Sequence, residues 1–128
     1  MQLPKEVKFG ADGLIPAVIQ DVNDGQVLMI GFMNRDALEK TLAEGKVCFW
    51  SRSRNKFWLK GESSGNFLLV KEVLVNCYVD SLLIKAEPVG PTCHDGYDSC
   101  YYRKITEEGG LEVIAEQKFD PNEVYGKH

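Results

Sequence analysis

The sequence lacks any long hydrophobic run. No window of the 128-residue sequence comes close to the roughly 18 consecutive apolar residues that a membrane-spanning helix needs. The N-terminus also has no basic stretch followed by an apolar one. We therefore expect no membrane contact and a cytoplasmic protein. Positive charge is also in short supply, because 15 Lys and Arg face 19 Asp and Glu and give a net charge of -4. This balance predicts no nucleic-acid partner, although a local cationic patch can still hold a phosphate.

Histidine is scarce, and closely paired cysteines are absent. The chain has two histidines and four cysteines, and no two cysteines show the C-x2-C spacing of common structural zinc sites. Without a signal peptide, a reducing compartment and metal ligation are favoured over disulfides. The sequence also has no internal repeat, low-complexity tract or linker, so we expect one domain spanning residues 1–128.

Turn-forming residues divide the chain into short elements. Asn23-Asp24-Gly25 separates the apolar runs 15–22 and 27–30 and predicts a β-hairpin. Residues 35–45 have apolar positions on one face, with Asn34 as a candidate N-cap and a glycine at the end, which predicts a helix. Further strands, rich in β-branched and aromatic residues, are predicted at 47–51, 57–60, 67–75, 78–86 and 111–116. The chain is therefore predicted to be mainly β, of the α+β class, with one main helix.

Three cysteines are the most informative residues. Cys77, Cys93 and Cys100 follow the spacing C-x15-C-x6-C, and the last two lie in a polar segment bounded by glycine and proline. Three thiolates leave one position open on a tetrahedral zinc ion, which is the arrangement that holds a reactive water. The alternative is that the three thiols fill the core as small apolar residues. Cys48 stands within an apolar strand, and we expect it in the core.

His94 follows Cys93 directly. A lone histidine is more often structural than catalytic, but this position beside a predicted zinc thiolate favours a chemical role. Because imidazole titrates near neutral pH, His94 is predicted either to complete the coordination or to act as a general base on the bound water.

Residues 50–66 combine cations, hydroxyls, glycines and two tryptophans. Arg52, Arg54 and Lys60 are candidates to pair with a phosphate, serines and backbone N–H groups can donate to it, and a tryptophan can stack on a base. The mixture predicts a site for a phosphorylated aromatic ligand. A solvated Ser/Arg hairpin with two core tryptophans would have almost the same sequence.

With these residues in view, the chain resembles phosphoribosyl-AMP cyclohydrolase, the zinc enzyme that opens the adenine ring in histidine biosynthesis. The matching blocks are 27–34, 49–54, 58–66, 90–96, 99–103, 119–121 and 123–127. The resemblance implies a mixed β pseudo-barrel or folded sheet in an intertwined homodimer. It also implies one zinc ion per subunit, held by Cys77 of one subunit and by Cys93 and Cys100 of the other.

The resemblance also implies a reaction. Hydroxide generated on zinc would attack C6 of the N1-ribosylated adenine of 1-(5-phosphoribosyl)-AMP, break the N1–C6 bond and give the formimino-AICAR ribonucleotide, with His94 moving protons. The substrate-binding residues it implies are Trp50, Ser51, Arg52, Ser53, Arg54, Lys60, Glu62, Ser63 and Ser64. Two alternatives stay open: a zinc hydrolase of another N-substituted purine-like substrate, and a non-catalytic dimer clamped by zinc.

One departure from the family concerns magnesium. The family usually carries an Asp-Cys-Asp-x-Asp run that binds Mg²⁺, whereas this chain has Asn76, Tyr78 and Asp80 at the three positions. One carboxylate and one amide make a poor site for a hard dication, although Mg²⁺ often keeps several waters and uses substrate phosphates. A magnesium requirement is therefore an open expectation. Asp95, Asp98 and Glu62 are the candidates to restore the lost charge.

Overall fold

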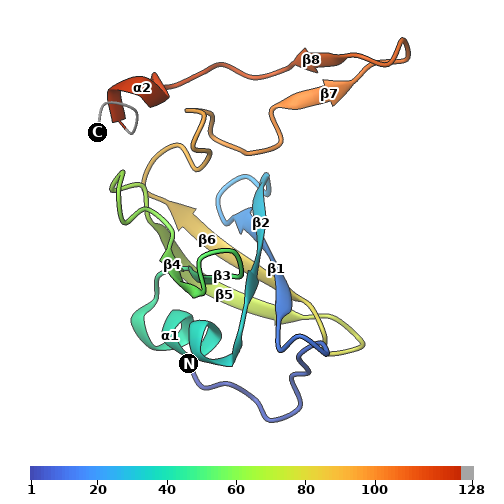
Figure 1. Cartoon of the computed structure of the whole chain (residues 1–128), viewed down its shortest axis with the longest axis vertical. Coiled ribbons are helices and arrows are strands. Elements are labelled where there is room, and N and C mark those ends of the chain that lie inside the picture. The colour runs from blue at the N-terminus through green and yellow to red at the C-terminus, as the bar shows by residue number, and fades with distance from the viewer. Residues whose placement is uncertain (125–128) are drawn as a thin grey trace.

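A four-stranded mixed sheet forms the centre of the molecule (Figure 1). The computed structural model describes residues 1–124. Its elements are β1 (Ile15–Asp21), β2 (Val27–Met33), α1 (Arg35–Glu44), β3 (Cys48–Ser51), β4 (Lys56–Leu59), β5 (Leu68–Val75), β6 (Leu82–Pro88), β7 (Arg103–Ile105), β8 (Leu111–Val113) and α2 (Pro121–Val124). The predicted mainly β fold with one main helix is confirmed.

The strand order in the central sheet is β2-β1-β6-β5. Strand β1 runs antiparallel to β2 and parallel to β6, and β5 runs antiparallel to β6. The pairs β3–β4 and β7–β8 form two separate antiparallel hairpins. This order has β2 and β5 at its ends and does not close into a ring, so of the two expected forms, a pseudo-barrel or a folded sheet, the described strands do not form the first within one copy of the chain.

Local signals fixed the first half of the chain as predicted. The β1–β2 hairpin turns at residues 22–26, where the side chain of Asp24 accepts a hydrogen bond from Gln26 N at 2.9 Å. The side chain of Asn34 caps α1 by accepting from Ala37 N at 2.8 Å, and Gly45 ends the helix with a left-handed φ of 74°. Both elements depend on contacts between residues that are near in sequence.

The hydrophobic core lies between the central sheet, α1 and β3. Alternate residues of β1 and β6 point into it, as the period of two along a strand requires. Its fully buried members include Ile15, Ala17, Ile19, Met33, Ala37, Val47, Leu68, Ile84 and Ala86. Cys48 is also fully buried, as predicted, and burial raises the pKa of its thiol. No helix within residues 1–124 is long and apolar enough to cross a membrane.

Two sequence predictions for the second half of the chain are wrong in their bounds. The strand expected at 78–86 begins only at Leu82, because residues 76–81 form a turn in which Val79 has a positive φ of 51°. Cys77 therefore lies in the turn between β5 and β6 and not beside the first residue of a strand. The strand expected at 111–116 ends at Val113, and β7, its partner, was not predicted.

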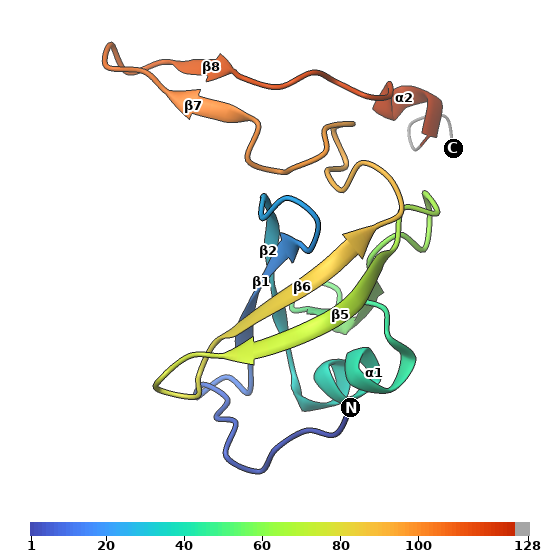
Figure 2. The same ribbon diagram turned by 180° about the vertical axis from the view of Figure 1, so that it is seen from behind.

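The C-terminal segment stands away from the sheet as an arm (Figures 1 and 2). It comprises the β7–β8 hairpin and the chain that leads to α2. Every residue of β7 and β8 is exposed. The base of the arm is attached to β2, where Ser99 Oγ donates to Val27 O at 2.7 Å and Cys100 N donates to Leu28 O at 2.8 Å. This attachment fixes the loop that carries Cys93 and Cys100 against the body of the protein.

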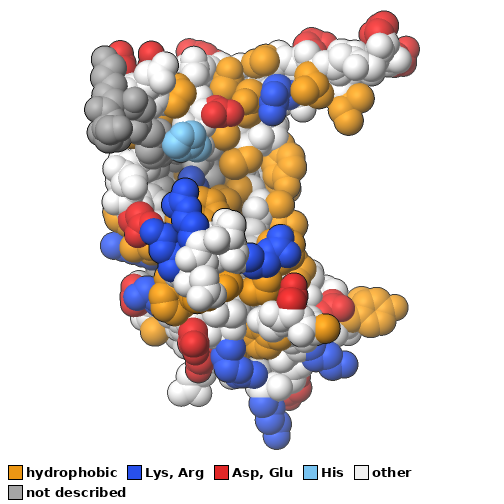
Figure 3. Space-filling model, viewed as in Figure 1, with side chains coloured by type: hydrophobic (Ala, Val, Ile, Leu, Met, Phe, Trp, Pro, Cys, Tyr) orange, Lys and Arg blue, Asp and Glu red, His pale blue; other side chains and the backbone are white. Residues whose placement is uncertain are grey.

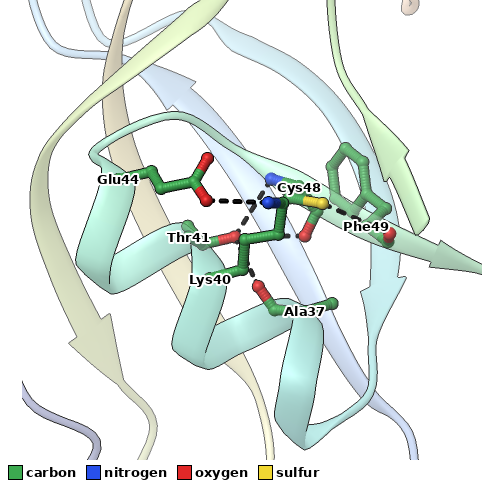
Figure 4. A network of polar contacts seen from close by, with 6 residues as sticks. All are labelled: Ala37, Lys40, Thr41, Glu44, Cys48 and Phe49. Atoms are coloured by element: carbon green, nitrogen blue, oxygen red, sulfur yellow. Dashed lines mark hydrogen bonds and ion pairs between the residues drawn. The ribbon is translucent and has the colours of Figure 1, made fainter.

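One buried hydroxyl joins α1 to β3 (Figure 4). Thr41 Oγ1 lies 2.9 Å from Ala37 O and 3.1 Å from Cys48 O, and it accepts a hydrogen bond from Cys48 N at 3.0 Å. Cys48 is the first residue of β3, so this contact sets where the strand begins relative to the helix. It thereby positions β3, which continues into the polar segment 50–66.

We expect Thr41→Val to lower the free energy of unfolding by about 1–3 kcal/mol, because the isosteric side chain leaves the buried N–H of Cys48 without an acceptor. Urea denaturation followed by tryptophan fluorescence measures the loss. The control is Lys40→Gln on the same helix, which breaks the exposed 2.7 Å ion pair with Glu44 and should leave the midpoint almost unchanged. Equal midpoints for the two variants would contradict the role given to Thr41.

Candidate active site

A tight loop of residues 92–100 brings Cys93 and Cys100 together. Three backbone hydrogen bonds close it, from Thr92 N to Asp98 O at 3.2 Å, from Cys93 N to Tyr97 O at 2.9 Å and from Gly96 N to Cys93 O at 2.9 Å. The buried Cys93 sulfur accepts a further hydrogen bond, from Asp95 N at 3.4 Å. The thiol of Cys100 lies close enough to Cys93 for that residue to raise its pKa. Two of the three predicted zinc ligands therefore form a pair within one copy of the chain.

The electrostatics of this pair suit a cation. Although part of the Cys100 residue is exposed, burial around its sulfur, and then the adjacent Cys93, raises the pKa of the Cys100 thiol to about 12. A second thiolate this close to the first is unfavourable without a positive charge. A bound metal ion removes this penalty by replacing the thiol protons. Two adjacent sulfur donors with these properties fit zinc.

Lys60 lies beside the pair and is almost completely buried, with 6% of its surface exposed. Burial lowers the pKa of its ammonium group, while the negative charge available from Cys100 and Cys93 opposes that shift. The residue immediately follows β4, and its N–H donates to Val47 O at 3.1 Å. The β3–β4 hairpin thus carries a cation to the cysteine pair.

Cys77 is not part of the pair. It lies in the turn at the start of β6, whereas Cys93 follows the end of β6. The seven residues of β6, which lie between the two positions in the chain, alone extend over roughly 20 Å at about 3.3 Å per residue. Accordingly, within residues 1–124 no three His, Cys, Asp or Glu side chains are grouped to hold a metal ion. One copy of the chain therefore brings two of the predicted sulfur ligands, Cys93 and Cys100, to one place, and the third, Cys77, to another.

His94 and most of the predicted substrate-binding residues line one cavity of about 430 Å³. The predicted residues that line it are Ser51, Ser53, Arg54, Lys60, Glu62, Ser63, Ser64 and His94. On the same face, Figure 3 shows blue Lys and Arg side chains gathered below the pale blue histidine. The cavity therefore joins hydroxyls and positive charge to the imidazole that follows Cys93.

Trp50 and Arg52 line a neighbouring hollow of about 580 Å³ instead. The guanidinium of Arg52 lies over the ring of Phe32 at 4.9 Å, and the ring of Trp50 meets that of Phe57 edge to face at 5.4 Å. Ser51, Ser53 and Trp58 border both spaces. The two hollows are therefore adjacent, and the predicted residues are divided between them.

Four cavity residues were not among the predicted set: Lys56, Phe57, Trp58 and Gly61. All four lie in the polar and aromatic segment 50–66 that the sequence had singled out. The pairing of β3 with β4 was the missing information, because it sets Trp58 opposite Phe49 and Lys56 opposite Ser51. Deriving the strand register of this hairpin from the turn at residues 52–55 would have identified these residues.

Asp95 does not replace the lost magnesium carboxylates within one copy. Its carboxylate accepts a 2.6 Å hydrogen bond from the hydroxyl of Tyr102, which raises the pKa of that tyrosine. The ring of Tyr102 is stacked on that of Tyr97 at 3.8 Å. Asp98 Oδ2 lies 3.9 Å from Lys118 Nζ. Glu62 lines the cavity. Asp95 and Asp98 thus stiffen the 92–100 loop, at the far end of β6 from the turn that holds Asn76, Tyr78 and Asp80.

The C-terminal segment crosses the 92–100 loop at Gly96. Lys118 N donates to Gly96 O at 2.6 Å, and Gln117 Nε2 donates to Asp95 O at 2.9 Å. Gly96 has a left-handed φ of 93°, and a Cβ placed on it would overlap the carbonyl oxygen of Phe119. Only glycine fits here, because the loop turns sharply and the returning chain lies directly on it.

Comparison with known proteins agrees with these features. A family model described as phosphoribosyl-AMP cyclohydrolase matches residues 29–102. The phosphoribosyl-AMP cyclohydrolases of Chlorobium phaeovibrioides and Pelotomaculum thermopropionicum are each 53% identical over 121 residues, which cover 94% of this chain and 88% and 94% of theirs. That of Chlorobium chlorochromatii is 52% identical over 126 residues, covering 98% of this chain and 92% of the relative.

We expect Gly96→Ala to destabilise the protein more than Gly109→Ala. Both glycines have positive φ, but a Cβ at Gly109 meets nothing within 4 Å, whereas one at Gly96 meets the backbone of Phe119. The strained φ costs each variant about 1 kcal/mol, so the difference between them measures the packing of the C-terminal segment on the loop. Urea denaturation gives that difference, and limited proteolysis shows whether residues 114–124 are released. Equal loss in the two variants would contradict this packing.

Proposed function

The chain belongs to the phosphoribosyl-AMP cyclohydrolase family, and from this premise we infer that it hydrolyses the N1–C6 bond of the adenine ring of 1-(5-phosphoribosyl)-AMP in histidine biosynthesis. The observation in the structure that supports this activity most directly is the 430 Å³ cavity. In it, His94 faces a set of cations and hydroxyls, and the residue before it belongs to the cysteine pair. A nucleotide with two phosphorylated ends needs such a combination.

We propose that the cavity holds the substrate through its cationic and hydroxyl side chains. Arg54 and Lys56 come from the turn and the start of β4, and Ser63 and Ser64 come from the turn that follows it. Cations and hydroxyls arranged in this way pair with phosphate oxygens. Trp58 borders both hollows and offers an aromatic wall for the base. Trp50 and Arg52, in the adjacent hollow, are then placed for the more distant part of a long ligand.

We propose that zinc is held by Cys93 and Cys100 of one copy and by Cys77 of a second. The adjacent thiols fit the metal, and the distance along β6 keeps Cys77 of the same copy out of reach. When bound, zinc supplies a Lewis acid that lowers the pKa of a water molecule to about 7 in well-studied enzymes. All four cysteines are free thiols, which is in keeping with a cytoplasmic location.

His94 is proposed to transfer the proton in ring opening. Hydrolysis adds the oxygen of one water to C6, breaks the N1–C6 bond and leaves the exocyclic amine as part of a carboxamide. Because the oxygen ends as the carbonyl oxygen of the carboxamide, both protons of that water must leave it. One goes to the exocyclic nitrogen, which is an imine in the neutral N1-substituted ring, and the other goes to N1 as N1 departs. An imidazole on the cavity wall is placed to carry this proton from the oxygen to N1.

A second copy of the chain also accounts for the exposed apolar arm. Ile105, Leu111 and Val113 of the β7–β8 hairpin are 79%, 62% and 52% exposed, and Ile30 on β2 is 47% exposed. Apolar side chains this exposed on an extended hairpin gain stability when another surface covers them. We therefore propose a homodimer in which the arms cover apolar surface and complete two zinc sites.

The activity is tested with synthetic phosphoribosyl-AMP and zinc-loaded protein in an ultraviolet assay. We expect His94→Ala to lower kcat at least 100-fold, the smaller end of what a positioned general base contributes. Zinc content, measured by atomic emission, should stay unchanged if His94 transfers protons, and should fall if it is a ligand. Lys5→Ala, outside both hollows, is the control. Zinc-loaded wild-type protein that leaves phosphoribosyl-AMP intact but hydrolyses another N-substituted purine would contradict the proposed substrate.

The shared zinc site predicts complementation between two inactive variants. Cys77→Ala and Cys93→Ala should each lose zinc and activity as pure proteins. When the two are unfolded together and refolded, about half of the dimers are mixed, and each mixed dimer regains one complete site. About a quarter of the wild-type activity should then return, because half of the dimers carry one site of two. A mixture that stays inactive while both variants fold and dimerise would show that the three cysteines do not come from two chains.

A further inference from the structure

The turn between β5 and β6, which carries Cys77, is closed by the side chain of Asn76. Asn76 Oδ1 accepts hydrogen bonds from Asp80 N at 2.9 Å and from Ser81 N at 3.0 Å. Asn76 Nδ2 donates to Asp80 Oδ1 at 2.8 Å. Both lone pairs of the amide oxygen are thus occupied, and the amide nitrogen is bound to the one carboxylate of the turn. The carboxamide links the two ends of the turn.

The same turn is strained at Val79 and is held on both sides of it. Val79 has a φ of 51°, which is rare for a β-branched residue. Its N–H donates to Asn76 O at 3.0 Å, and its carbonyl accepts from Lys8 N at 2.7 Å. A backbone conformation of this kind persists only where the surrounding contacts determine it. The turn therefore has a defined shape, and Cys77 has a defined place in it.

The residues of the turn do not fit magnesium. Mg²⁺ prefers an octahedral shell of oxygens, usually with one or two carboxylates. Here the oxygen of Asn76 is already used by two N–H donors, and Tyr78 brings a phenol that is 74% exposed. Only Asp80 offers a carboxylate, and the amide of Asn76 donates to it. A cation would have to displace the hydrogen bonds that shape the turn.

We propose that Asn76 is a positioning residue. Its carboxamide takes the place of a bound cation in this turn, so that Cys77 is held for the shared zinc site without magnesium. A carboxylate at position 76 would lie close to that of Asp80, and two such like charges repel unless a cation lies between them. The amide N–H of Asn76 removes that repulsion by donating to Asp80. The positioning of Cys77 rests on the shared zinc site proposed above, whereas the stability of the turn does not.

The first test measures zinc affinity by competition with a chromogenic chelator, with and without Mg²⁺. The wild-type affinity should be the same in both conditions. Asn76→Asp should weaken zinc binding roughly tenfold, the smaller effect seen when groups that orient metal ligands are changed, and Mg²⁺ should restore it by bridging the two carboxylates. Asn76→Ala should weaken binding as well, without rescue by Mg²⁺. Asn23→Asp makes the same chemical change in the β1–β2 turn and should have no effect.

The second test uses the thermal unfolding of metal-free protein and does not need zinc. Asn76→Asp should lower the midpoint, and Mg²⁺ should raise it again, while the wild-type midpoint should not respond to Mg²⁺. A wild-type midpoint or zinc affinity that rises with Mg²⁺, and no longer does so in Asp80→Asn, would overturn the proposal. Unchanged zinc affinity in both Asn76 variants would overturn it too. If wild-type protein turns over substrate and binds zinc in these cases, the proposed function stands and only the role of Asn76 fails.

Discussion

The length of one strand sets the organisation of this site. Strand β6 is roughly 20 Å long at about 3.3 Å per residue, and it has Cys77 before its first residue and Cys93 beyond its last, so the two cysteines lie toward its opposite ends. A hydrogen-bonded strand cannot bend to close this distance. In the proposal that all three sulfurs bind one ion, two copies of the chain must therefore lie side by side. The exposed apolar arm that begins just after Cys100 is the surface that we propose a second copy covers.

Around Cys93 and Cys100, separate elements hold a single loop. Ser99 and Cys100 are bonded to β2, Asp95 is bonded to Tyr102, and the C-terminal segment is bonded to Gly96 and Asp95. These contacts leave two thiols side by side, with the pKa of Cys100 raised to about 12, and with the buried Lys60 nearby. A rigid pair with this penalty on its charged form favours a bound cation over two free thiolates. The loop also fixes His94 on the wall of the cavity.

Two polar residues beside the cysteines act in the same way. Asn76, at a position where the family usually has an aspartate, and Asp95 each make hydrogen bonds that stiffen the loop around a cysteine. Asn76 bonds Asp80 and the backbone beside Cys77, and Asp95 bonds Tyr102 and the sulfur of Cys93. Hydrogen bonds of this kind fix the direction in which a neighbouring side chain points, which is how the groups around a metal site orient its ligands.

The sequence alone determined the features that depend on neighbouring residues. The β1–β2 hairpin, the capped helix α1, the burial of Cys48 and the family followed from turn residues, apolar spacing and the motifs around Cys93 and residues 50–66. The turn at 76–81 was missed because these residues include no glycine or proline, and the hydrogen bonds of the Asn76 side chain four and five residues ahead cannot be read from the sequence. Tertiary structure decided which predicted residues share a cavity: the turn 52–55 sends Arg52 over Phe32 and leaves Arg54 in the cavity. It also decided the distance between Cys77 and Cys93, because sequence spacing counts residues, whereas the separation of two side chains depends on whether the chain between them is extended or folded back.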